Sequence, residues 1–194
     1  MFSERGDRVK VLAITGYKPN ELGIYRRDAP EIEYIKHTIK KRLIAFLDEG
    51  LEWVVLSGQP GVEQWTAETV IQLKEEWPHL KLAVLPPFLN QEKIWPEDAQ
   101  ERYHALLQQA DFTEAISKRE YENPGQLRAK NDFIIMKTDA LLLMYNEEQP
   151  GTPKYYLEAA ERRSQRDNYP IYWITPDELQ EAVEEASSHH DFLE

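Results

Sequence analysis

Residues 51–65, LEWVVLSGQPGVEQW, constrain the fold more than any other stretch of this chain. They begin with a short apolar run of β-branched and aromatic residues at 53–56, which is typical of a buried strand. The run stops at a loop, SGQPG, and then enters a pattern that we expect to be helical as far as residue 77. A strand, a loop with two glycines and a helix therefore follow one another without a spacer.

This order of elements suits an anion such as a phosphate, because backbone N–H groups and the positive end of a helix dipole meet beyond the strand. Gly58 and Gly61 fit that interpretation, since a backbone that approaches a ligand closely cannot carry Cβ atoms. Ser57 adds a hydroxyl, and Glu63 places a carboxylate in the first helical turn. The alternative is an ordinary turn between strand and helix, in which Glu63 only complements the helix dipole.

Composition excludes several classes of protein. The chain has 194 residues, of which 41% are hydrophobic and 30% charged, so we expect a globular protein. It contains no cysteine and no apolar run long enough to cross a bilayer, and its first residues lack the apolar core of a signal peptide. We therefore expect a cytoplasmic protein without membrane contact. A net charge of −12 disfavours nucleic acid as a partner.

Apolar runs alternate with helix-length segments along the whole chain. This alternation predicts an α/β fold, a Rossmann-like doubly wound, mostly parallel sheet with helices on both faces. We expect one domain over residues 9–187, a flexible N-terminal extension at 1–8 and a flexible C-terminal tail at 188–194. The predicted strands are residues 9–15, 53–56, 80–85, a weak one at 112–117, 140–145 and 171–174.

Ligands of such sheets bind at the carboxyl ends of the strands, where the winding reverses. The loops predicted there are residues 15–18, 57–63, 86–88 and 145–152. The first of them brings Gly16 and Lys18, a glycine followed by a cation that suits a phosphate or remains solvated. Three of the four loops carry glycine, which favours a ligand site at this edge.

Three segments of the sequence resemble one family. TGYKPNELGI near the start, SGQPGVEQW and the later GTPKY are similar to the YpsA family, the UPF0398-type bacterial proteins. This family belongs to the SLOG superfamily, with DNA-processing protein A and the LOG-type phosphoribohydrolases. The resemblance places Glu63 at an acidic site position and Arg128 with Asn131 in an R-x-x-N motif. It also places Gly151 and Thr152 in a second loop that contacts phosphate.

What the resemblance implies is a pocket for a nucleotide or an ADP-ribose-like derivative, in a sensor or regulator. Two alternatives stay open, a hydrolase that cleaves a ribosyl N-glycosidic bond and a single-stranded DNA-binding protein. The LOG-type pattern P-G-G-x-G-T-x-x-E has Tyr155 in place of its glutamate here, which weighs against the hydrolase. The sequence assigns no catalytic residue, no metal ligand and no cofactor beyond the nucleotide-like ligand, and it leaves open a protein partner or a homo-oligomer.

Overall fold

The computed structural model describes residues 8–190. Its centre is one six-stranded sheet in which every neighbouring pair of strands is parallel, in the order β4-β3-β2-β1-β5-β6. The predicted Rossmann-like α/β fold is confirmed, and the sheet is parallel throughout. The strands are β1 (Val11–Gly16), β2 (Trp53–Leu56), β3 (Lys81–Val84), β4 (Phe112–Thr113), β5 (Ala140–Met144) and β6 (Ile171–Ile174).

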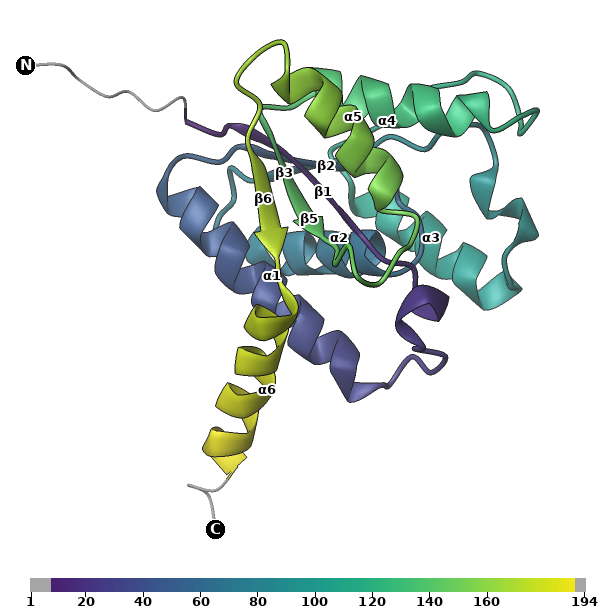
Figure 1. The fold of residues 1–194 in the computed structure, drawn as a ribbon. Coiled ribbons are helices and arrows are strands. Elements are labelled where there is room, and N and C mark those ends of the chain that lie inside the picture. Colours follow the sequence, from purple (N-terminus) through teal and green to yellow (C-terminus); the bar gives the residue numbers. More distant parts are fainter. Residues whose placement is uncertain (1–7, 191–194) are drawn as a thin grey trace, which may run out of the picture.

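Helices cover both faces of this sheet (Figure 1). One face carries α1 (Pro30–Asp48), α2 (Val62–Leu73), α3 (Glu97–Gln109) and α6 (Pro176–His190). The other face carries α4 (Gly125–Lys137) and α5 (Lys154–Ser164), which lie side by side. Two short 3₁₀ helices, η1 (Pro19–Leu22) and η2 (Gln91–Ile94), follow β1 and β3. Within residues 8–190 no helix combines the length and the apolar composition needed to cross a membrane.

The central strands are buried on both faces because each faces a layer of helices. All five residues of β5 are buried, and β1 is buried from its second residue onward. Alternate residues of β1 point to opposite layers, so that Leu12 and Ile14 join the core under α1 while Ala13 joins the core under α4. This double burial explains why the two strands appear in the sequence as nearly continuous apolar runs.

Three elements differ most in extent from the sequence prediction. The weak strand expected at 112–117 is only the two-residue edge strand β4. Helix α2 ends at Leu73 and not at residue 77, where the following Pro78 disfavours helical backbone. Helix α6 continues to His190, so the first part of the tail predicted at 188–194 is helical. The predicted N-terminal extension at 1–8, except residue 8, lies outside the described residues. Residues 191–194 of the predicted tail also lie outside them.

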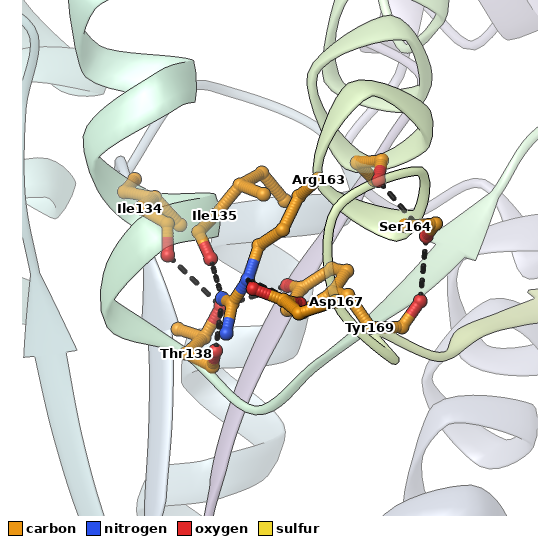
Figure 2. A network of polar contacts seen from close by, with 8 residues as sticks. Ile134, Ile135, Thr138, Arg163, Ser164, Asp167 and Tyr169 are labelled. Carbon is orange, nitrogen blue, oxygen red and sulfur yellow. Dashed lines mark hydrogen bonds and ion pairs between the residues drawn. The ribbon is translucent and has the colours of Figure 1, made fainter.

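The end of α4 is tied to α5 by one arginine (Figure 2). The Arg163 guanidinium donates hydrogen bonds to the carbonyl oxygens of Ile135 and Thr138, the latter at 2.6 Å. It also pairs with Asp167 at 3.2 Å and lies 4.3 Å from the centre of the Tyr169 ring. A cation at the carboxyl end of a helix satisfies carbonyl groups that have no partner within the helix. Arg163 therefore fixes the end of α4 relative to α5.

We expect Arg163→Met to lower the free energy of unfolding by about 2 kcal/mol, because it leaves two carbonyl oxygens without their charged donor. Chemical denaturation measures this loss. Arg166→Met, at an exposed arginine three residues further on, is the matched control and should change stability by no more than about 0.5 kcal/mol. Equal effects of the two substitutions would contradict the assigned role of Arg163.

Candidate functional site

The winding of the sheet reverses between β1 and β5, where ligands of doubly wound folds commonly bind. In this chain a tyrosine fills that crevice. The Tyr17 hydroxyl lies 3.0 and 2.6 Å from the carbonyl oxygens of Asn146 and Gln149, and it accepts a hydrogen bond from the Asn146 N–H at 2.9 Å. The loop after β1 and the loop after β5 are thus joined directly to each other.

The predicted second phosphate loop is occupied in the same manner. The Glu21 carboxylate accepts hydrogen bonds from the Thr152 N–H at 2.7 Å and from the Thr152 hydroxyl at 3.0 Å. The Lys18 N–H donates to the same carboxylate at 2.7 Å. Gly151 packs against Tyr17, whose ring a Cβ at Gly151 would approach to 2.9 Å. A carboxylate of the chain itself therefore stands where the resemblance implies a phosphate.

An open pocket of about 480 Å³ lies beside this crevice, at the carboxyl ends of β1, β2 and β3. Three of the four predicted loops contribute to it, and the loop of Gly151 and Thr152 does not. Helices η2 and α4 complete its wall. Its lining combines cations, aromatic rings and apolar side chains: Lys18, Pro19, Asn20, Ser57, Gln59, Pro60, Pro87, Phe88, Leu89, Asn90, Gln91, Lys93, Ile94, Trp95, Glu120, Tyr121, Leu127 and Lys130.

Lys130 is the most unusual residue of this pocket. It is only 4% exposed, and its Nζ donates a hydrogen bond to the Tyr156 hydroxyl at 3.1 Å. Burial lowers the pKa of Lys130 to about 8, an effect that the Glu63 carboxylate opposes and the nearby Lys18 ammonium strengthens. Within the described residues neither lysine forms an ion pair with a carboxylate. Two cations that repel each other beside an open pocket are an arrangement that an anion would stabilise.

Glu63 has a different environment from the one predicted. Its side chain is fully buried and does not line the pocket. One oxygen accepts the Thr15 hydroxyl at 2.9 Å, and the other accepts the Ser57 hydroxyl at 2.7 Å together with the N–H groups of Ser57 and Gln59 at 3.1 and 3.2 Å. Four donors occupy the carboxylate, which joins β1 to the loop after β2 and to α2.

The three glycines next to this carboxylate contact protein and not an open cavity. A Cβ at Gly16 would lie 2.7 Å from the Val62 side chain, and one at Gly58 would lie 2.8 Å from the Tyr103 ring. At Gly61, with φ +94°, a Cβ would lie 2.4 Å from the Tyr17 carbonyl oxygen. These positions require glycine for the close packing of β1, α2 and α3, which is the turn alternative considered for the sequence.

The predicted R-x-x-N pair is divided between surface and core. Arg128 is exposed and does not line the pocket, because it lies on the outer side of α4. Asn131 is 6% exposed, and its side-chain oxygen has no hydrogen-bond partner within the described residues. Of the ten predicted site residues, the structure places only Lys18 and Ser57 in the lining of the pocket.

The sequence prediction missed Lys130 and most of the aromatic lining. A signal for Lys130 exists, because Leu127, Lys130 and Ile134 follow one another at three- and four-residue steps on α4. A lysine in the apolar stripe of a helix is either paired or functional, as burying an ammonium is costly. Phe88 and Tyr121, whose ring centres are 5.2 Å apart, come from loops far apart in the sequence and give no such signal.

A larger hollow of about 820 Å³ lies over α4 and α5, on the layer away from the strand ends. Two of its three arginines have partners in the protein: Arg162 pairs with Asp132 at 2.8 Å, and Arg163 caps α4, while Arg166 is exposed to solvent. The hollow is therefore a less suitable anion site than the lysine-bearing pocket. Within residues 8–190 no group of three or more His, Asp or Glu side chains is arranged to hold a metal ion.

The fold and the site define a class, a Rossmann-like α/β domain with a lysine-bearing pocket at the carboxyl edge of its sheet. The family model described as the YspA SLOG family (YpsA) matches residues 12–179, and the chain belongs to this family. It is 56% identical over 179 residues to the UPF0398 protein YpsA of Bacillus subtilis, covering 92% of this chain and 99% of that protein. A UPF0398 protein of Bacillus velezensis is 55% identical over 177 residues, with 91% and 97% covered.

The structure is also similar to a solved one, that of DNA processing protein A from Helicobacter pylori. The TM-score is 0.52 with 16% sequence identity, covering 91% of this chain and 72% of that one. This similarity supports the SLOG fold. That structure concerns the single-stranded DNA binding mode of the Helicobacter pylori protein.

We expect Gly61→Ala to destabilise the protein by about 1–3 kcal/mol more than Gly50→Ala, because only the first substitution forces a side chain into a backbone neighbour. Both glycines have positive φ, at +94° and +106°, but nothing lies within 4 Å of a Cβ at Gly50. The comparison of unfolding free energies thus separates crowding from backbone strain. Equal losses of unfolding free energy in the two variants would contradict the prediction, because the contact at Gly61 would then add no cost.

Glu63→Gln should lower the free energy of unfolding by about 1–3 kcal/mol, since the amide presents N–H groups to donors that need an acceptor. Glu68→Gln, on the same helix, is the control. The Glu68 carboxylate is 42% exposed and pairs with Lys36, so its loss should cost only about 0–1 kcal/mol. A Glu63→Gln variant as stable as the wild type would refute the structural role of this carboxylate.

Proposed function

We propose that this protein binds a phosphate-bearing nucleotide or nucleotide derivative, such as ADP-ribose, in the pocket between Lys18 and Lys130, and that it acts as a sensor or regulator. The buried ammonium of Lys130 is the observation that carries the proposal. A protonated lysine without a carboxylate partner is costly, and a ligand phosphate would repay that cost. The neighbouring rings of Phe88, Trp95 and Tyr121 offer faces on which a base can stack.

Binding is favoured over hydrolysis because the carboxylates at and near the pocket, Glu63 and Glu120, already have partners within the protein. Cleavage of a ribosyl bond requires a carboxylate that can steer water or accept charge at the anomeric carbon. Glu63 is saturated by four donors, and Glu120 at the rim pairs with Lys93 and accepts a hydrogen bond from Asn90. No carboxylate in the lining of the pocket is free for that role.

Single-stranded DNA is the second candidate ligand. It is supported by the solved structure of DNA processing protein A, whose subject is single-stranded DNA binding, and by the combination of lysines with aromatic rings in the pocket. A DNA strand would extend beyond one pocket and contact several phosphates. Its affinity should then fall steeply with salt, whereas a single nucleotide depends on salt only weakly.

Isothermal titration calorimetry with AMP, ADP-ribose, NAD⁺, a cyclic dinucleotide and a short oligothymidylate tests the proposal. We expect at least one nucleotide to bind, and Lys18→Ala or Lys130→Met to weaken it about tenfold or more, as lost charge-assisted hydrogen bonds do. The affinity should also fall as the pH rises from 7 to 9, because Lys130, with a pKa of about 8, loses its charge there. Lys130→Met should remove this pH dependence.

Lys137→Met is the matched control, since Lys137 lies two turns further along α4, exposed and away from the pocket. It should leave nucleotide affinity unchanged. If only the oligothymidylate binds, with a steep dependence on salt, DNA is the ligand. If no compound binds at millimolar concentration, the proposed function is wrong.

A further inference from the structure

The Lys130 side chain combines three features that suit an amine nucleophile. The residue is only 4% exposed and yet forms part of the lining of an open pocket. A phenolic hydroxyl, that of Tyr156, lies 3.1 Å from the Nζ, and the Tyr156 ring centre lies 4.3 Å from it. A second cation, Lys18, lines the same pocket. Desolvation and a neighbouring cation are the means by which proteins keep a lysine amine neutral and nucleophilic.

We propose that Lys130 is a carbonyl-capturing amine, which forms a reversible imine with a phosphorylated ligand that carries a free aldehyde, such as the open-chain form of a terminal ribose. The inference rests on the proposed function, because the phosphate brings the aldehyde to the lysine. The charged forms of both lysines attract the phosphate to the pocket, Lys18 keeps it there, and the neutral fraction of Lys130 reacts with the carbonyl carbon. A nucleotide whose ribose C1 is blocked binds without reacting.

The amine must be neutral to react. Burial lowers the pKa of Lys130 to about 8. About a tenth of an amine with this pKa is neutral at pH 7, whereas an ordinary lysine is protonated almost completely. The groups that act on this amine are the Lys18 ammonium, the Glu63 carboxylate and the Tyr156 hydroxyl. Burial raises the pKa of Tyr156 well above its ordinary value, so this hydroxyl keeps its proton near neutral pH.

The reaction needs no other reagent. The nitrogen lone pair attacks the aldehyde carbon, an N–C bond forms, and the carbonyl oxygen takes up a proton to give a carbinolamine. The nitrogen releases its two protons in turn, one when the carbinolamine forms and one as the hydroxyl is protonated, and the C–O bond breaks as water leaves. The products are the imine and one water molecule, and hydrolysis reverses every step. The Tyr156 hydroxyl is placed to relay these protons, because it can donate and accept a hydrogen bond at the nitrogen.

Borohydride trapping on the full-length protein tests the inference. The protein is incubated with ADP-ribose, with ribose 5-phosphate, or with NAD⁺, whose ribose C1 is blocked at the nicotinamide and whose phosphates are otherwise similar. Sodium cyanoborohydride then reduces any imine to a stable amine, and peptide mass spectrometry locates the adduct. We expect an adduct on Lys130 that forms at least tenfold faster than on the exposed Lys137, and none with NAD⁺. Lys130→Arg should retain the charge and lose the adduct.

The outcomes separate this inference from the proposed function. If calorimetry detects ADP-ribose binding but Lys130 reacts no faster than Lys137, the imine is refuted and the binding function stands. If ribose 5-phosphate labels Lys130 while no nucleotide binds, the amine is confirmed and the nucleotide function is refuted. Even if Lys130→Arg fails to fold, peptide mass spectrometry of the wild-type protein decides the question, since it compares adduct formation on Lys130 and on Lys137 of the same helix.

Discussion

A single buried carboxylate, that of Glu63, connects the segments on which the pocket is built. Glu63 lies in the first turn of α2, and its carboxylate accepts hydrogen bonds from a hydroxyl of β1 and from a hydroxyl and two N–H groups of the loop after β2. Removing a carboxylate from water is costly unless its oxygens are saturated, and here four donors repay that cost. The same negative charge acts on Lys130 and opposes the loss of its proton. The carboxylate that fixes the loops thus also favours the charged form of Lys130, against the effect of burial.

The helix N-termini of this fold are already supplied with negative charge. In a βα unit the loop before the helix offers N–H groups to an anion. In this chain Glu63 accepts those of the loop before α2, and Glu21 accepts the Thr152 N–H before α5. Two positions that a phosphate could use are therefore filled by the chain's own side chains. A ligand phosphate must find its positive charge elsewhere, and Lys18 and Lys130 provide it at the neighbouring pocket.

The fold could be predicted from the sequence because its central strands are buried on both sides. The run at 53–56 matches β2 residue for residue, and the run at 140–145 differs from β5 by one residue. The run at 171–174 also matches β6, although this strand lies at the edge of the sheet and is only partly buried. The edge strand β4 was overestimated, since its residues are exposed and lack such a run. At the site, glycine-rich loops mark a strand-to-helix turn but do not distinguish backbone packed on a ligand from backbone packed on protein. Gly61 belongs to the second kind, because its neighbour is the Tyr17 carbonyl oxygen.

Lys130 and most of the aromatic lining were missed for a related reason, and that reason bears on the chemistry of the pocket. A phosphate site made of helix N-termini has backbone donors, which carry no net charge and do not titrate near neutral pH. A site made of lysines has donors whose charge depends on their surroundings, and burial has brought the pKa of Lys130 to about 8. A small change of environment then changes whether this residue is a cation or an amine. Glu21 and Glu63 already accept the backbone N–H groups before α5 and α2. A ligand anion is therefore recognised by a lysine side chain, which can be charged or neutral, and not by a helix dipole of fixed charge.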